Sequence, residues 1–174
     1  MLDWTQTMSQ SYRFYKVDPV TWMDSHELNQ ISDCSINWDS TSSTLGSASI
    51  TTTEIIEECY IRTYMVAIQN GVKETIPMGT FLYQMPSNDY DGKCQNIKMN
   101  GYTPLIELKE KAPSIGYTIK KGTKYMELAS KLTEENVRAP VIGITTASKL
   151  SSNFTAGTDE KWLTYLTDLI ATDH

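Results

Sequence analysis

The clearest hydrophobic pattern in this 174-residue chain lies between Tyr60 and Tyr83, where two arms rich in β-branched and aromatic residues flank a short polar centre. The centre reads Gln69-Asn70-Gly71-Val72. Asn-Gly favours a tight type I′ turn because both residues tolerate positive φ. The pattern therefore predicts an antiparallel hairpin that turns at Asn70-Gly71.

The first arm of this hairpin is apolar on both faces. Alternation along a strand places on one face Tyr60, Tyr64, Val66 and Ile68. The opposite face carries Ile61, Met65 and Ala67. A sheet with one face in water would alternate apolar and polar residues instead. The pattern therefore requires something to cover the second face of the hairpin.

Strand patterns fill the remainder of the first hundred residues. Residues 9–24 predict a strand, a break at Pro19 and a short extended piece, whereas residues 25–34 are polar and turn-like. Residues 34–53 predict two strands around a connection rich in serine, threonine and glycine, and residues 94–102 predict another strand.

Two further breaks are expected. Proline cannot donate a ladder hydrogen bond, so the stretch around Pro77 and Gly79 should form an edge, a bulge or a bend. Residues 87–93, with Asp91-Gly92 at the tip, predict a turn.

Helical signals begin after Gly101. Thr103, Thr123 and Thr158 are each placed to cap a helix. The apolar face of the last helix comprises Trp162, Leu163, Tyr165, Leu166, Leu169 and Ile170. This face is wide for a short helix, so we expect it to dock on its own sheet or on another polypeptide. Residues 138–150 return to an extended pattern. Strands followed by helices predict an α+β fold.

Composition narrows the function. The net charge of −6 disfavours a protein that grips nucleic acid by its phosphates, but it permits a surface past which nucleic acid slides. No apolar run is long enough to span a membrane, and the N-terminus lacks the pattern of a signal peptide. The widely spaced Cys34, Cys59 and Cys94 predict reduced thiols, at least two of them in strands, rather than a disulfide framework or a zinc site.

No motif predicts catalysis. His26 has no partner in a triad or metal-ligand spacing, and we interpret it as a surface turn residue. The cluster of Glu54, Glu57 and Glu58 is interpreted as a solvated edge rather than as paired catalytic carboxylates. No catalytic residue, cofactor or bound metal is therefore expected.

Two other polar stretches have simple interpretations. Residues 88–91 lack the glutamate of a calcium loop and are interpreted as a polar turn. Residues 120–124 are interpreted as a solvated helix start rather than an anion site. Four aromatic residues are expected in the core or at an interface rather than as a platform for stacking nucleic-acid bases: Trp22, Trp38, Tyr60 and Tyr64. The residues alone indicate a non-enzymatic, strand-rich module whose apolar content favours assembly.

Several short segments follow one another in a distinctive order. They are YKVDPVTW (15–22), SINWD (35–39), GSASI (46–50), YIRTY (60–64), IPMGTFL (76–82), GYTPLIEL (101–108), GYTIKKGT (116–123), RAPV (138–141) and WLTYLTDL (162–169). This succession, from about Tyr15 to Ile170, resembles the N-terminal part of tail hub proteins of long-tailed bacteriophages and phage-tail-like particles. These proteins are also called baseplate hub or tail-tip proteins.

The resemblance implies an antiparallel β-barrel or split barrel of the tail-tube type, flanked by short helices. One face of the hairpin would then pack in the core of this barrel, and a neighbouring subunit or the helix that follows Thr123 would cover the other face. Residues 1–147 would form this barrel domain, and residues 148–174 a linker and a connecting helix that leads to a missing or separate second hub domain. In that family, hub subunits form a trimeric or pseudo-hexameric ring. The ring joins the tail tube and the distal tail protein to a tip or spike, and it surrounds a channel through which DNA passes.

The resemblance further implies partners and a location. The partners would be other hub subunits, the distal tail protein, the tail tube, the tape measure protein and a tip or spike protein. The chain would be made in the bacterial cytoplasm and reside in the virion, without entering a membrane. The residues expected at subunit interfaces are Tyr60, Tyr64, Phe81, Tyr83, Trp162, Tyr165, Leu166 and Leu169. The alternative is a free-standing module that binds a carbohydrate or another ligand; a cell-wall hydrolase ranks third.

Overall fold

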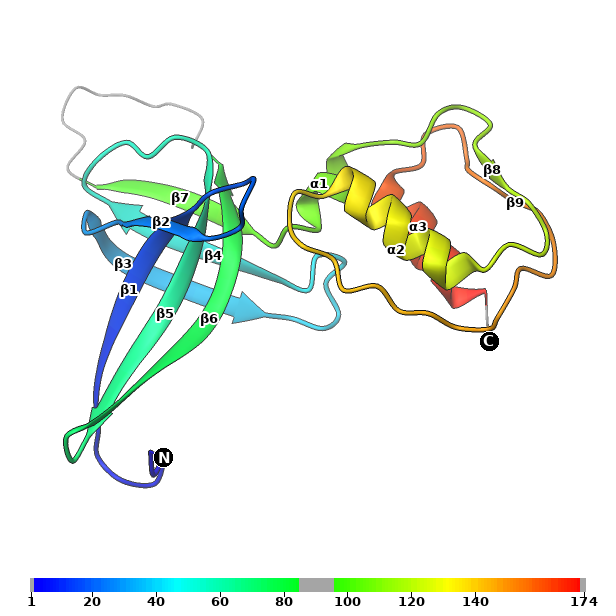
Figure 1. Cartoon of the computed structure of the whole chain (residues 1–174). Helices are drawn as coiled ribbons and strands as arrows, with labels where there is room; N and C mark the ends of the chain where they lie inside the picture. Colours follow the sequence, from blue (N-terminus) through cyan, green and yellow to red (C-terminus); the bar gives the residue numbers. More distant parts are fainter. Residues whose placement is uncertain (1, 85–95, 173–174) are drawn as a thin grey trace. The chain divides into compact units, whose positions relative to one another are not determined.

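Strands precede helices along the chain, so the predicted α+β class is confirmed (Figure 1). A computed structural model describes residues 2–84 and 96–172. The predicted turn at residues 87–93, and Cys94, lie outside the described residues. The chain divides into two units, Met1–Thr103 and Pro104–His174.

The first unit is one antiparallel sheet. Its strands are β1 (Ser9–Val17), β2 (Asp24–Glu27), β3 (Ile31–Trp38), β4 (Gly46–Thr52), β5 (Cys59–Gln69), β6 (Val72–Gln84) and β7 (Ile97–Tyr102). Their order in the sheet is β2-β1-β5-β6-β7-β4-β3. Within the described residues no ladder joins β2 to β3, so the sheet is open.

The predicted hairpin is confirmed. β5 pairs with β6 from Cys59↔Tyr83 to Gln69↔Val72, and Asn70 and Gly71 both have positive φ, 50° and 79°. The predicted break is a β-bulge, because Thr63 pairs with Gly79 whereas Tyr64 pairs with Pro77. Pro77 is tolerated because β7 pairs only with Leu82–Gln84, which leaves that side of β6 without a ladder partner at Pro77.

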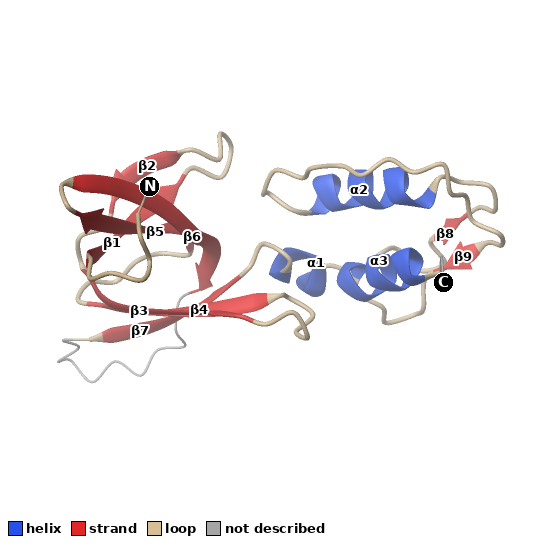
Figure 2. Cartoon of the chain, turned by 90° about the horizontal axis from the view of Figure 1, so that it is seen from below, coloured by secondary structure: helices blue, strands red, loops and turns tan. Residues whose placement is uncertain are grey.

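The bulge and the short β6–β7 ladder let the sheet curl. In Figure 2, strands β3, β4 and β7 lie across from β1, β5 and β6. The face between the two halves is called the inner face, and the opposite face the outer face. Trp38 at the end of β3 reaches back to β6, where its indole Nε1–H donates to the Met78 carbonyl at 3.3 Å. Its ring lies 5.3 Å from that of Phe81.

The inner face of β5 is buried along its whole length. Every second residue of this strand has less than a tenth of its surface exposed: Cys59, Ile61, Thr63, Met65, Ala67 and Gln69. Near the base of the hairpin this row meets side chains from both halves of the sheet. The core there includes Phe14, Ala48, Ile50, Phe81, Tyr83 and Met99.

The N-terminal segment covers the inner face near the hairpin turn. The Asp3 N–H donates to Gln69 Oε1 at 2.8 Å, and Gln69 Nε2 donates back to the Asp3 carbonyl at 2.9 Å. The Leu2 N–H donates to Glu74 Oε1, and the Leu2 side chain is buried. These bonds satisfy a polar residue at the end of an otherwise largely apolar row.

The outer face of the hairpin is covered from within the first unit. Trp22, in the connection between β1 and β2, packs edge-on against Tyr60 with ring centroids 4.7 Å apart. This contact corrects the expectation that a neighbouring subunit or the helix after Thr123 covers the outer face at Tyr60. Coverage ends toward the turn, where Ile68 is 43% exposed.

The edge of the sheet also corrects a local prediction. Residues 25–34 were expected to be turn-like, but they contain most of β2 and the start of β3. β2 pairs with β1 through Tyr15↔Glu27 and Lys16↔His26. A polar strand is stable there because an edge strand needs a ladder on one side only, while its side chains remain in water.

The second unit contains three helices and a two-stranded ladder within its described residues: α1 (Ile106–Glu110), β8 (Thr118–Ile119), α2 (Tyr125–Asn136), β9 (Phe154–Thr155) and α3 (Trp162–Ala171). Its core joins Leu108, Tyr125, Leu132, Trp162 and Leu169. The expected domain boundary after residue 147 falls inside this unit, because α3 completes the same core as α1 and α2. Residues 138–150, predicted to be extended, form no strand.

A buried ion pair closes the second unit. Glu107 is 5% exposed, and its carboxylate accepts a 2.7 Å bond from the Arg138 backbone N–H and a second bond from the Arg138 guanidinium. Together these bonds tie α1 to the segment that follows α2. A buried carboxylate needs such partners because its desolvation is costly.

None of the three predicted threonine caps is used. The helices begin after Leu105, Lys124 and Lys161, and no side chain caps them. The Thr103 hydroxyl instead donates to the Thr44 carbonyl at 2.5 Å inside the first unit. Thr103 therefore bonds to a residue distant in sequence instead of capping the helix that follows it.

Gly101→Ala should destabilise the first unit. A Cβ at position 101 would lie 2.7 Å from the ring of Tyr83, which is fully buried and has no room to retreat. We expect a loss of about 1–3 kcal/mol in the free energy of unfolding, measured by denaturant titration. Gly143→Ala is the matched control, because its Cβ would meet only Ser130 at an ordinary 3.5 Å. Equal stability of the two variants would contradict the packing described.

The second unit should lose stability at high pH through Tyr165. Burial raises the pKa of Tyr165 to about 12, and its hydroxyl donates to the Phe154 carbonyl at 3.1 Å. An unfolded tyrosine ionises near pH 10, so the unfolded state loses its proton first and stability should fall between pH 10 and 12. Tyr165→Phe should flatten this fall in pH-dependent unfolding curves. An unchanged slope in the variant would contradict the assignment.

Candidate functional site

The aromatic residues predicted at interfaces in the first unit belong mostly to its core. Tyr60, Phe81 and Tyr83 are 1%, 0% and 0% exposed. Tyr64 is partly exposed, and its hydroxyl donates to Asp24 Oδ2 at 2.8 Å. The expectation that these side chains meet another subunit is corrected for the three buried residues, because the curled sheet and the Trp22 connection already enclose them.

The predicted interface of the last helix is likewise internal. Trp162, Tyr165, Leu166 and Leu169 are all buried in the core of the second unit. Tyr117 packs edge-on against Trp162 with centroids 5.2 Å apart, and Phe154 lies 5.0 Å from Tyr165. The apolar face of α3 packs in the core that it shares with α1 and α2, whereas the sequence led us to expect docking on the chain's own sheet or on another polypeptide.

A charged network on the outer face has a structural role. Arg62 donates to Asp24 Oδ1 at 2.8 Å, to the Trp22 carbonyl at 3.1 Å and to Thr80 Oγ1 at 3.0 Å. The guanidinium thus fixes the connection that carries Trp22. Since its donors are occupied within the chain, Arg62 is not a candidate ligand-binding residue.

The groups considered for catalysis are dispersed. His26 is exposed on β2, and Glu54, Glu57 and Glu58 are exposed in the connection between β4 and β5. Within the described ranges no three His, Cys, Asp or Glu side chains gather closely enough to hold a metal ion.

The two described cysteines lie in strands, as predicted. Cys34 is in β3 and Cys59 is in β5, and burial raises the pKa of both thiols. A raised pKa keeps a thiol protonated and therefore weakly nucleophilic. Cys34 lies beside Tyr83 in the interior, and burial raises the pKa of that phenol as well.

Two polar groups in residues 120–124 also have partners within the chain. The Lys121 N–H donates to Asn153 Oδ1 at 2.9 Å, and the Lys124 ammonium pairs with Glu127 at 2.7 Å. Helix α2 begins at Tyr125 without a side-chain cap. These contacts agree with a solvated helix start.

Exposed apolar side chains lie on both faces at the end of the hairpin, with Ile68 on the outer face and Val72 on the inner face, where it pairs with Gln69. Trp4, Ile68 and Val72 are 58%, 43% and 46% exposed, and they are called the tip surface. Val72 pairs with Gln69, Ile68 precedes that residue, and Trp4 follows Asp3, whose backbone is bonded to Gln69. The tip surface combines residues distant in sequence, and the hairpin pattern alone did not include Trp4.

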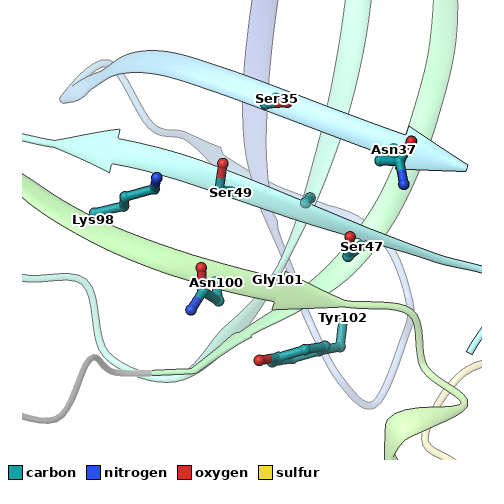
Figure 3. A pocket seen from close by; sticks show the side chains of 9 residues that line it. Ser35, Asn37, Ser47, Ser49, Lys98, Asn100, Gly101 and Tyr102 are labelled. Atoms are coloured by element: carbon teal, nitrogen blue, oxygen red, sulfur yellow. The ribbon is translucent and has the colours of Figure 1, made fainter.

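A second candidate surface lies on the outer face of β3, β4 and β7, where polar side chains line a hollow of about 360 Å³ (Figure 3). Ladder pairing aligns Ser35 with Ser49 and Asn100 in one row. It aligns Asn37 with Ser47 and Tyr102 in the next. The polar strip is defined as Ser35, Asn37, Ser47, Ser49, Lys98, Asn100 and Tyr102.

The side chains of the polar strip are free. Within the part of the chain that the structure describes, none of the seven makes a side-chain hydrogen bond or an ion pair. By contrast, the hollow of about 230 Å³ beside β1 contains Asp24, which is paired with Arg62, and Arg13, whose guanidinium lies 3.8 Å from Glu27. The polar strip therefore has unused hydrogen-bonding capacity.

The sequence carried a weak signal for the polar strip. Serine and asparagine alternate with apolar residues in β4 and β7, which predicts strands with one wet face. That pattern is the same for an ordinary solvated face and for a binding face. Only the ladder register brings the polar residues of three strands together.

No protein-family model matches this chain, and a search of curated proteins finds no relative. Within the described residues, none of the helices combines the length and apolar character needed to cross a membrane.

Trp162→Ala should destabilise the second unit strongly. Trp162 is 8% exposed and contacts the rings of Tyr117 and Tyr165, so truncation leaves a large cavity. We expect a loss of about 3–5 kcal/mol, measured by chemical denaturation. Ile170→Ala on the same helix, where the side chain is 45% exposed, should change stability by only about 0.5 kcal/mol. A small loss for Trp162→Ala would show that α3 is dispensable for this core.

Proposed function

We propose that this chain is a structural component of the tail tip of a long-tailed bacteriophage or a related particle. In this role it is a hub subunit, and its curled sheet corresponds to the split barrel of the tail-tube type. It joins the tail tube and the distal tail protein to a threefold tip and surrounds part of the DNA channel. Its location is the virion, after synthesis in the host cytoplasm.

The observation that carries the proposal is where the resembling segments fall in the fold. YKVDPVTW contains the end of β1 and Trp22, which covers Tyr60. IPMGTFL contains the bulge at Gly79. WLTYLTDL is the buried helix α3. These three of the nine resembling segments determine packing and strand geometry, and a resemblance that includes them favours a shared fold.

The tip surface is the part of the first unit best suited to subunit contacts. It presents three exposed apolar side chains around the end of one hairpin, on both of its faces, and exposed apolar side chains near one another are typical of protein interfaces. The partners proposed are other hub subunits in a trimeric or pseudo-hexameric ring, the distal tail protein, the tail tube, the tape measure protein and a tip or spike protein. The net charge of −6 suits a channel that DNA crosses without binding.

Charged substitutions at the tip surface should weaken assembly without unfolding the chain. The variant Ile68→Asp/Val72→Asp buries two carboxylates in any interface formed there, whereas both positions are largely exposed in the free chain. We expect a loss of complexes at least about tenfold in apparent affinity, measured by analytical ultracentrifugation of the chain alone and with the neighbouring tail proteins.

Ile115→Asp is the matched control, because Ile115 is 86% exposed in the second unit and lies outside the tip surface. Immunogold electron microscopy of particles from the producing host would locate the chain. Labelling elsewhere than at the tail tip, or a wild-type chain that remains a monomer with every tail protein, would refute the proposed function.

A further inference from the structure

We propose that the polar strip binds a small saccharide, with the hydroxyl groups of one or two pyranose rings held by Asn37, Asn100 and the serines between them. This activity goes beyond the structural role and does not depend on it. The argument uses the shape of the hollow, the chemistry of its lining and the charge around it.

The shape comes from an arrangement of small and large side chains. Ala48 and Gly101 line the hollow with their backbone, because their Cβ positions face the inner core, and the small side chains of Ser35, Ser47 and Ser49 line it on the outer face. In Figure 3 the longer side chains of Lys98, Asn37 and Tyr102 stand around these serines. The volume of about 360 Å³ lies near the lower end of the range of about 300–1,000 Å³ for small-molecule sites.

Packing fixes the backbone beneath the hollow at Gly101. A Cβ there would project to the inner face and meet the buried ring of Tyr83 at 2.7 Å. Asn100 and Tyr102, which flank Gly101 in the strand, project to the opposite, outer face and line the hollow.

The lining matches the chemistry of sugar hydroxyls. A hydroxyl group both donates and accepts, and so do the amides of Asn37 and Asn100 and the hydroxyls of the serines. Neighbouring strands lie about 4.8 Å apart, which is comparable with the width of a pyranose ring. Since these side chains make no bonds within the described chain, ligand binding does not have to break any internal bond.

Tyr102 supplies the apolar part of such a site. A pyranose ring presents C–H groups on its faces, and an aromatic ring offers a flat apolar surface with a polar hydroxyl at its end. Tyr102 is partly exposed, and in Figure 3 its ring extends beside Asn100. Lys98 adds one positive charge at the end of the strip, which suits a saccharide that carries a carboxylate.

The charge disfavours the main competing ligand. A nucleic acid needs several cationic groups along its phosphates, but among the described residues Lys98 is the one basic residue that lines the hollow, and the chain carries a net charge of −6. The strip is a face of side chains, whereas an added peptide strand would pair along the free edge of β3 rather than fill the hollow.

The test is NMR titration of the isotopically labelled chain with maltotriose, tri-N-acetylchitotriose and trigalacturonic acid. Saturable shifts at the amides of Ser47, Ser49 and residues 98–102 are expected for at least one saccharide, with a Kd of about 0.1–5 mM. Asn100→Ala and Tyr102→Ala should each weaken that binding by about tenfold, because both positions contact the ring. Lys98→Ala should weaken binding of the acidic saccharide alone.

Matched controls are Asn29→Ala and Tyr12→Ala, which remove an exposed amide and an exposed phenol away from the strip. Thermal midpoints of all variants confirm folding, and Asn100→Asp serves if Asn100→Ala unfolds. Absence of saturable shifts up to about 10 mM for all three saccharides would overturn the proposal. So would shifts located elsewhere, or equal weakening by the control variants. The Ile68→Asp/Val72→Asp variant should bind normally, which separates this result from the outcome for assembly.

Discussion

Burial of the inner row of β5 is the constraint on which the first unit depends. This row runs from Cys59 to Gln69 without an exposed member, and near the base of the hairpin it meets side chains from β4 and β7 as well as from β1 and β6. A flat sheet could not provide these contacts. The bulge at Gly79 and the short ladder between β6 and β7 are the local features that let the sheet curl around the row.

Burial of side chains also determines which surfaces remain available for function. Most of the aromatic residues that the sequence predicts at interfaces are instead buried in the two cores. Tyr83 and Tyr165 are fully buried. Two surfaces of the first unit remain exposed. One is the tip surface, at the end of the hairpin that Trp22 does not cover, and the other is the polar strip on β3, β4 and β7. The assembly and the saccharide binding that we propose would therefore use separate parts of the first unit.

The second unit has its own source of stability. Its helices share one core, and the Arg138–Glu107 pair ties α1 to the segment after α2. Because α3 completes this core, the helix expected to connect to a further domain is an internal element of the unit.

Local chemistry by itself determined the turn at Asn70-Gly71, the irregularity near Pro77 and the succession of strands and helices, because each depends on the φ preference or hydrogen-bonding capacity of neighbouring residues. Tertiary structure alone decided the division at Thr103, the covering of Tyr60 by Trp22, the partner of Thr103 and the alignment that creates the polar strip. These outcomes depend on contacts between residues distant in sequence. An apolar residue in the sequence predicts that its side chain will be buried. Which residues it packs against depends on how the whole chain folds.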